Sequence, residues 1–309
     1  MSQITATPDT ARRVVVGFDG SARARRAVHH AARYADGRSL GLTVLLASPL
    51  LDPTTPRVAR AVKADPGYLE AIRTAAADEL RGVCEEVTSD HPDLSVIPAL
   101  MAGNPAGALA TASLDAALVV IGARGNTEEH RAPMLGGVST AVIAHAHGPV
   151  LVVPENAIPT PDGPVVVGLQ DAPDSLAAGK LAVAEAEQRG VPLVALYAWD
   201  IAPELGDLGA LARLDPVKTQ RDLDQMLTEL LEPLIADHPD LPVQRRVVQG
   251  SARTALVDAS ALASLVVIGS RGLGGFAGLL LGSISRSVTR EAVCPVMIVR
   301  HRGPKTDAA

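Results

Sequence analysis

The sequence contains one short pattern twice, LVVIGARG at residues 118–125 and LVVIGSRG at residues 265–272. In both places an apolar, largely β-branched run leads directly into glycine, which is typical of a buried strand that ends in a tight loop. The same offset of 147 residues relates SDHPDLSV at 89–96 to ADHPDLPV at 236–243. Internal repetition at a fixed distance indicates two copies of one domain.

Further matches define the limits of the two copies. RVVVGFDGS at 13–21 matches PVVVGLQDA at 164–172 with an offset of 151, so the second copy is four residues shorter before its HPDL turn. Gly103 pairs with Gly250 at the offset of 147. The segment PENAIPTPDGP between the copies is rich in proline and lacks apolar periodicity, as linkers do. We therefore expect a first domain over residues 1–155, a linker over 156–163 and a second domain over 164–309.

Short apolar runs alternate with helical spacing in each copy. The first copy has strand-like runs VVVGF, LTVLLAS, LSVIPAL, LVVIG and VLVV, and the stretch between the first two predicts a helix capped by Ser21. A longer helix is expected over about 68–88. Strands that are apolar throughout and separated by helices indicate a parallel sheet covered on both faces. The predicted fold is therefore α/β and doubly wound, with ligands bound beyond the carboxyl ends of the strands.

Composition excludes several classes of protein. A net charge of −6 and 2% aromatic residues argue against general nucleic-acid binding and against base stacking. The N-terminal stretch MSQITATPDTARR has no apolar signal-peptide core, and no run approaches the length of a membrane span. The two cysteines, Cys84 and Cys294, allow neither a disulfide framework nor a Cys-based zinc site, and each is expected to be a small buried apolar residue. We expect a soluble, cytoplasmic protein.

The glycine-rich loop of the second copy has the spacing Gly269, two residues, Gly272, nine residues, Gly282 and Ser283. Glycine at the first two positions lets the backbone turn close to a ligand. The last two positions begin the next helix, whose free N–H groups suit an anionic phosphate. Ser283 and Ser285 can add hydroxyl donors, although Ser283 equally fits a simple helix N-cap. The alternative is a flexible turn between a strand and a helix.

Better-known phosphate motifs do not fit this loop. It contains no lysine and no GxxxxGK[ST] pattern, which excludes a Walker A loop. Gly272, Gly274 and Ala277 satisfy GxGxxA, but they follow the fourth strand of the copy rather than the first, so a nicotinamide or flavin site is not expected. The GxSxG elbow of hydrolases is absent.

The loop spacing after a VVIG strand, together with the opening VVVGFDGS, resembles the universal stress protein family, twice and over nearly the whole chain. The resemblance implies two tandem Rossmann-like domains, each with a five-stranded parallel sheet in the order 3-2-1-4-5. It implies that the loop holds the phosphates and ribose of ATP, alone or with Mg²⁺, and that an Asp at the end of the first strand approaches the adenosine. It also implies pairing through the last strands, here as an internal pseudo-dimer, with a homodimer as a further option.

The two copies differ at the positions that matter for this resemblance. The second copy has the complete loop, but Gln170 stands where the family has Asp. The first copy has Asp19, but ten residues separate Gly125 from Gly136, and Gly137 replaces the capping serine. Its loop also contains two acidic residues and a proline, Glu128, Glu129 and Pro133. We expect the second copy to be the better nucleotide site and the first to bind weakly, to bind another adenine nucleotide or to be empty.

Candidate nucleotide contacts follow from the loop and the resemblance. In the second copy they are Gly168, Gln170, Ile268, Gly269, Arg271, Gly272, Gly282, Ser283, Ile284 and Ser285. In the first copy they are Gly17, Asp19, Gly122, Arg124, Gly125, Gly136, Gly137 and Ser139. Arg124 and Arg271 fit a counter-charge to phosphate as well as they fit ordinary surface arginines. Trp199 ends the second strand of its copy, near where the family places adenine.

The histidines suggest no metal site. His145 and His147 are two residues apart with no carboxylate or cysteine at a ligand spacing, and a helix-end interaction is expected for them. His29 and His30 are expected on the solvated side of the first helix, and His91 and His238 in the repeated HPDL turns.

Together these features predict a stress-response regulator or switch that binds an adenine nucleotide, without catalytic residues. No acidic pair or lysine accompanies the loop to support phosphoryl transfer. A slow ATPase in which Asp19 helps to hold the metal is one alternative. A nucleotide-free interaction scaffold is another, in which the glycines are inherited and neither copy binds.

Overall fold

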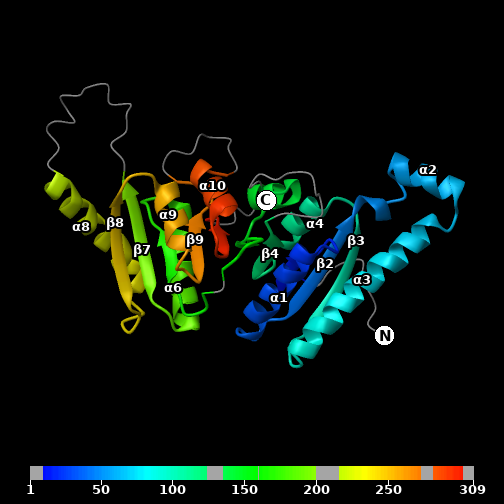
Figure 1. Ribbon diagram of the computed structural model, residues 1–309, viewed down its shortest axis with the longest axis horizontal. Coiled ribbons are helices and arrows are strands. Elements are labelled where there is room, and N and C mark those ends of the chain that lie inside the picture. Colours follow the sequence, from blue (N-terminus) through cyan, green and yellow to red (C-terminus); the bar gives the residue numbers. More distant parts are fainter. Residues whose placement is uncertain (1–9, 124–134, 159, 200–215, 273–280, 302–309) are drawn as a thin grey trace, which may run out of the picture. The chain divides into compact units, whose positions relative to one another are not determined.

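The computed structural model describes residues 10–123, 135–158, 160–199, 216–272 and 281–301. The chain divides into two compact units, Met1–Glu155 (unit 1) and Asn156–Ala309 (unit 2). Strands and helices alternate along both units (Figure 1). Within the described ranges, no helix combines the length and apolarity needed to cross a membrane.

Unit 1 contains a parallel sheet with the order β3-β2-β1-β4-β5. Helix α1 packs against α3, and α4 packs against α5. The strands are β1 (Val14–Gly17), β2 (Leu42–Ser48), β3 (Val96–Ala102), β4 (Leu118–Gly122) and β5 (Val150–Val153). The helices are α1 (Ala22–Asp36), a 3-10 turn (Pro49–Leu51), α2 (Pro56–Ala64), α3 (Tyr68–Asp90), α4 (Pro105–Ala112) and α5 (Gly137–His145).

Unit 2 repeats this arrangement with the order β8-β7-β6-β9-β10, again with parallel pairs. The strands are β6 (Val165–Gly168), β7 (Leu193–Trp199), β8 (Val243–Gln249), β9 (Leu265–Gly269) and β10 (Val296–Val299). The helices are α6 (Pro173–Arg189), α8 (Pro216–Ile235), α9 (Ala252–Ser260) and α10 (Ser283–Glu291). The predicted doubly wound fold and its strand order are confirmed in each unit.

Some local expectations need correction. Helix α2 was not predicted; Pro56 occupies its first turn, and only Val58 is buried, so it lacks the apolar stripe by which longer helices are recognised. Strand β8 has no buried residue, whereas the sequence predicted strands that are apolar throughout. It pairs on one side only, with β7, and an edge strand tolerates polar side chains such as Arg245. Residues 156–163, predicted as a linker, fall within unit 2, where the Ile158 N–H donates to the Val293 carbonyl at 2.8 Å; the domain limits themselves stay a prediction.

The repeated glycine has a conformational reason. Gly103 has φ +115° and Gly250 has φ +126°, values that side chains other than glycine rarely adopt. Each N–H donates to the carbonyl of the last residue of the neighbouring strand, Ser48 at 3.0 Å in unit 1 and Trp199 at 2.7 Å in unit 2. The two glycines therefore close the same turn in both units.

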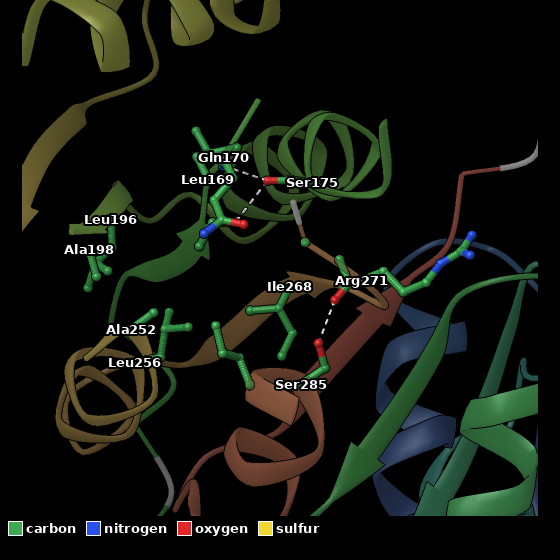
Figure 2. A pocket seen from close by; sticks show the side chains of 14 residues that line it. Leu169, Gln170, Ser175, Leu196, Ala198, Ala252, Leu256, Ile268, Arg271 and Ser285 are labelled. Atoms are coloured by element: carbon green, nitrogen blue, oxygen red, sulfur yellow. Dashed lines mark hydrogen bonds between the residues drawn. The ribbon is translucent and has the colours of Figure 1, made fainter. Parts of the chain in front are cut away.

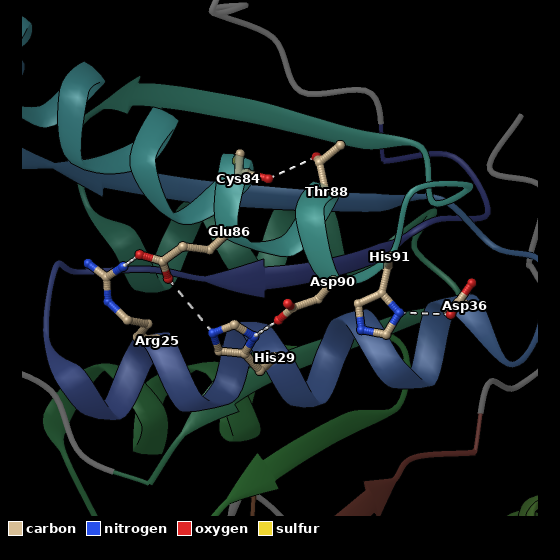
Figure 3. A network of polar contacts seen from close by, with 8 residues as sticks. All are labelled: Arg25, His29, Asp36, Cys84, Glu86, Thr88, Asp90 and His91. Carbon is tan, nitrogen blue, oxygen red and sulfur yellow. Dashed lines mark hydrogen bonds and ion pairs between the residues drawn. The ribbon is translucent and has the colours of Figure 1, made fainter.

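Histidines of the HPDL turns tie that turn to the first helix of each unit. His91 Nδ1 lies 2.8 Å from the Asp36 carboxylate, and His238 Nδ1 lies 3.0 Å from Glu187 (Figure 3 shows the first pair). His29 does not simply line a solvated face. It lies between Glu86 and Asp90 of α3, each at 3.8 Å, because α3 presents acidic side chains to α1.

Both cysteines are buried, as expected. Burial raises the pKa of the Cys84 thiol, and separately that of the Cys294 thiol, to about 12. A thiol with this pKa stays protonated at pH 8, and the thiolate is the reactive form.

We expect both thiols to resist a disulfide reagent such as DTNB at pH 8 in the native protein and to react rapidly in guanidinium chloride, where their pKa returns to about 8.5. Counting the thiols that react by absorbance in the two conditions checks this. Labelling of either cysteine in seconds without denaturant would contradict the burial.

Two helical glycines are predicted to respond oppositely to substitution. A Cβ on Gly179 of α6 would lie 2.6 Å from Leu234 Cδ1 and 3.1 Å from Leu169 Cδ2, so this glycine permits α6 and α8 to approach closely. A Cβ on Gly82 of α3 would meet nothing within 4 Å. Gly179→Val should lower the free energy of unfolding by about 1–3 kcal/mol through overpacking. Gly82→Ala should raise it by up to about 1 kcal/mol, because alanine favours the helix.

Urea unfolding followed by circular dichroism measures both variants. Equal or same-sign shifts would show that the α6–α8 contact is not limited by the size of residue 179.

Candidate functional site

An open pocket of ≈ 470 Å³, a volume that includes its mouth, lies in unit 2 beyond the carboxyl ends of β6, β7 and β9 (Figure 2). The position is where doubly wound folds bind ligands. The pocket is lined by Gly168, Leu169, Gln170, Ser175, Leu196, Ala198, Ala252, Leu256, Ile268, Gly269, Arg271, Gly272, Ile284 and Ser285.

One side of the pocket is apolar. Leu196 and Ala198 of β7 face Leu256 of α9, with Ile268 of β9 at the base (Figure 2). Successive side chains of a strand point to opposite faces, so Trp199 faces away from this surface. The structure thus does not bring Trp199 into the pocket, although the sequence suggested it near adenine. Its indole Nε1 is buried and bonds no residue that the structure describes.

Gly269 and Gly272 have different structural roles. A Cβ on Gly269 would lie 2.9 Å from the backbone carbonyl carbon of Asp174, so only glycine lets the end of β9 pass the first turn of α6. A Cβ on Gly272 would lie 2.5 Å from Oε1 of Gln170, which is the end of a movable side chain. Gly269 is therefore required by packing, and Gly272 keeps the pocket open beside Gln170.

The first turn of α10 presents unpaired N–H groups beside these glycines. Gly282 is the N-cap, so Ser283 is the first helical residue and the suggestion that Ser283 caps the helix is wrong. A glycine cap offers no side-chain acceptor, and within the described chain the N–H groups of Ser283, Ile284 and Ser285 have no partner. The Gly282 N–H donates to the Ser270 carbonyl at 2.9 Å. This turn has the positive character that suits an anion.

The serine hydroxyl groups are arranged differently from expectation. Ser285 is buried, and its hydroxyl donates to the Gly269 carbonyl at 2.8 Å. Ser139 of unit 1 donates to the Gly122 carbonyl at the same distance. Both protons are thus used within the protein, and neither serine offers its hydroxyl proton to a phosphate in this conformation. The exposed hydroxyl beside the first turn of α10 is that of Ser283.

Gln170 is held by its backbone and leaves its amide at the pocket. Its N–H donates to Ser175 Oγ at 2.8 Å, and its carbonyl accepts from the Ala172 N–H at 2.8 Å. Ser175 Oγ also lies 3.3 Å from the Gly168 carbonyl. The side chain at this position is consequently a neutral donor and acceptor that faces Gly272.

Unit 1 has the same frame around its counterpart site. Gly136 is the N-cap of α5, which corrects the expectation that Gly137 takes the capping position, and the Gly136 N–H donates to the Ala123 carbonyl at 2.9 Å. Asp19, beyond Gly17 at the end of β1, accepts the Ser21 N–H at 3.0 Å. The other loop residues that the sequence analysis singled out lie outside the described part of the chain: Arg124, Gly125, Glu128, Glu129 and Pro133.

The pocket contains eight of the candidates from the second copy and lacks Gly282 and Ser283, which lie at its border on α10. As ligand contacts all of them stay predictions. Sequence reasoning missed the lining residues that carry no motif: Leu169, Ser175, Leu196, Ala198, Ala252 and Leu256. The alternation of β7 was the signal that could have identified Leu196 and Ala198. Among the residues that the structure describes, no cluster of His, Cys, Asp or Glu could hold a metal ion.

Comparisons with known proteins agree with the repeat and the fold. Residues 10–154 and 163–300 each match the universal stress protein family. A universal stress protein of Mycobacterium tuberculosis is 34% identical over 307 residues, with 93% of this chain and 94% of that protein covered. The crystal structure of a universal stress protein from Archaeoglobus fulgidus has a TM-score of 0.67 at 19% identity, covering 94% of this chain and 97% of the other.

A further solved structure, a universal stress protein in complex with cAMP, is 25% identical and has a TM-score of 0.33, covering 45% of this chain and 98% of its own. The family matches on both halves, together with the relative of equal length, settle the classification. This chain belongs to the universal stress protein family, with two tandem copies of the family's domain.

Proposed function

We propose that this protein is a stress-response regulator that binds an adenine nucleotide, ATP, in the pocket of unit 2, and that it acts by binding rather than by turnover. The observation that carries the proposal is one pocket that combines an apolar side with an uncapped helix N-terminus. The apolar side suits the flat faces of a base, and the open N–H groups of α10 suit phosphate. A nucleotide has both parts.

The polar groups of the pocket are compatible with this ligand. Gln170 supplies an amide that can both donate to and accept from a base edge or a ribose hydroxyl. Among the described residues that line the pocket, Arg271 has the single charged side chain, and none has a carboxylate. A nucleotide would therefore enter without repulsion from the lining, alone or with a Mg²⁺ carried on its phosphates.

Binding without turnover is supported by the chemistry of the lining residues. Hydrolysis needs a group that orients or deprotonates a water and a means of stabilising the charge that develops on the transferred phosphoryl group. No Asp, Glu, His or Lys side chain is among the lining residues of the unit 2 pocket. The slow ATPase remains the alternative for unit 1, where Asp19 occupies the position of Gln170. The nucleotide-free scaffold is the other alternative. It would leave the pocket of unit 2 without a ligand.

The effect of Gly272→Glu tests the site. The added carboxylate would face the ligand and displace the Gln170 amide, and Gly272 is exposed, so the fold should survive. We expect native mass spectrometry at millimolar ATP to show bound nucleotide on the wild type and a loss of affinity of at least ~10-fold, about 1.4 kcal/mol, in the variant.

Gly82→Glu is the matched control, because it adds the same charge to α3 of unit 1, where a Cβ would meet nothing within 4 Å. It should bind as the wild type does. No mass shift of the wild type at millimolar ATP would refute nucleotide binding. If Gly272→Glu keeps the affinity of the wild type for ATP, the nucleotide binds somewhere other than this pocket.

A further inference from the structure

Strand β8 continues the face of the sheet on which the pocket lies. In the parallel register of β7 and β8, Leu196 pairs with Arg246 and Ala198 pairs with Val248. Residues paired in this way point to the same face of a sheet, and successive residues of a strand alternate between its faces. Since Leu196 and Ala198 line the pocket, Arg246 and Val248 lie on the pocket face of β8.

The neighbouring arginine agrees with this alternation. Arg245 Nε lies 4.0 Å from the Asp224 carboxylate of α8, so Arg245 is on the opposite face, which α8 covers. On the pocket face, helix α9 packs against β6 and β7. Arg246 is exposed there, and no residue of β8, which is described throughout, belongs to the pocket lining. Among the described residues, the apolar side of the pocket therefore ends at β7.

The fold does not use the Arg246 side chain. Within the described ranges this side chain takes part in no hydrogen bond or ion pair, in contrast to Arg245. Neighbouring strands lie about 4.8 Å apart, and an arginine side chain is longer than this spacing. The Arg246 guanidinium can therefore extend from β8 over the apolar side of the pocket, beside Leu196.

Unit 1 has no charged side chain at the equivalent position. Leu45 of β2, the counterpart of Leu196, pairs with Ala99 of β3, and Ala99 is fully buried. The sheet is thus complete with a small apolar residue at this place, and the fold has no need of an arginine there. The contact that Arg246 can make with a ligand is consequently a property of unit 2.

We propose that Arg246 extends the pocket of unit 2 onto β8 and stacks its guanidinium plane on the base of the bound nucleotide. The inference rests on the proposed function for the identity of the ligand. Arginine stacks on aromatic faces through its planar, weakly hydrated guanidinium. The described lining offers the base no aromatic side chain, and Figure 2 shows Arg271 extending away from Leu196 and Ala198. Arg246 supplies the planar contact that this apolar side lacks.

The test is isothermal titration of the full chain with ATP and with AMP. In Arg246→Gln we expect the affinity for both ligands to fall about fivefold, the size of one stacked cation. The two losses should be equal because the base is the same in both. Arg245→Gln is the matched control, since it removes the same charge from the next residue of β8, on the opposite face. It should keep both affinities within about twofold of the wild type.

Two further measurements separate stacking from attraction between charges. Arg246→Lys keeps the charge without the plane, so it should bind both nucleotides nearly as weakly as Arg246→Gln does. The loss caused by Arg246→Gln should also be similar at about 0.05 M and about 0.5 M salt, because salt screens exposed charges and leaves stacking in place. Circular dichroism verifies that each variant is folded, as the exposure of Arg246 leads us to expect.

The outcomes distinguish this inference from nucleotide binding itself. A loss larger for ATP than for AMP, abolished by high salt or restored by Arg246→Lys, would show that Arg246 acts on the phosphates and would overturn stacking. Unchanged affinities in Arg246→Gln would also overturn it, and either result leaves the proposed nucleotide site intact. Binding of neither nucleotide by the wild type would overturn both proposals.

Discussion

One hydrogen bond ties the helix to the end of the preceding strand at each candidate site. The hydroxyl of a serine in the first turn of a helix donates to the carbonyl of the glycine that ends the preceding strand, Ser285 to Gly269 in unit 2 and Ser139 to Gly122 in unit 1, both at 2.8 Å. The serine is buried in both units, so the bond is shielded from water. It fixes where the helix begins relative to the sheet. The uncapped N–H groups of α5 and α10 therefore begin at the same position relative to the sheet in the two units.

The two units conserve positions more faithfully than chemistry. Tyr34 of α1 stacks with Arg38, two residues beyond the end of that helix, at 3.8 Å, and the equivalent residues Glu185 and Arg189 of α6 form an ion pair at 3.1 Å. The two interactions hold the same part of the helix although one is a cation–π contact and the other a salt bridge. The ties of the HPDL histidines likewise keep an acidic partner while exchanging Asp for Glu. The two copies therefore keep contacts at equivalent positions, even where the type of interaction differs.

The architecture and the glycine border of the pocket could be predicted from the sequence. The N-cap of α10 and the side chains of β7 that line the pocket could not. Apolar strands between helices predicted the doubly wound fold, and the 147-residue repeat predicted two copies of it. The order of the strands was implied by the family resemblance. The glycine spacing located one border of the pocket. Ser283 was considered as an N-cap because serine is a preferred cap, but the N-cap is Gly282, where the close approach of Ser270 favours glycine. The apolar side of the pocket could not be predicted, because Leu196 and Ala198 look like core residues until it is known which face of the sheet their side chains point to.

The distribution of negative charge gives the difference between the units a physical meaning. Unit 1 carries its carboxylate, Asp19, at the end of β1, where a ligand would meet it directly. Unit 2 has the neutral Gln170 there and instead buries Asp174 in the first turn of α6, where its carboxylate accepts the Ser270 hydroxyl at 2.6 Å and lies 3.6 Å from Arg271. A carboxylate at the end of a strand adds negative charge to the mouth of the site, whereas a neutral amide at the same position does not. The complete glycine spacing stands in the unit that has the neutral side chain at this position. The loop diverged in the unit that retains a carboxylate at this position.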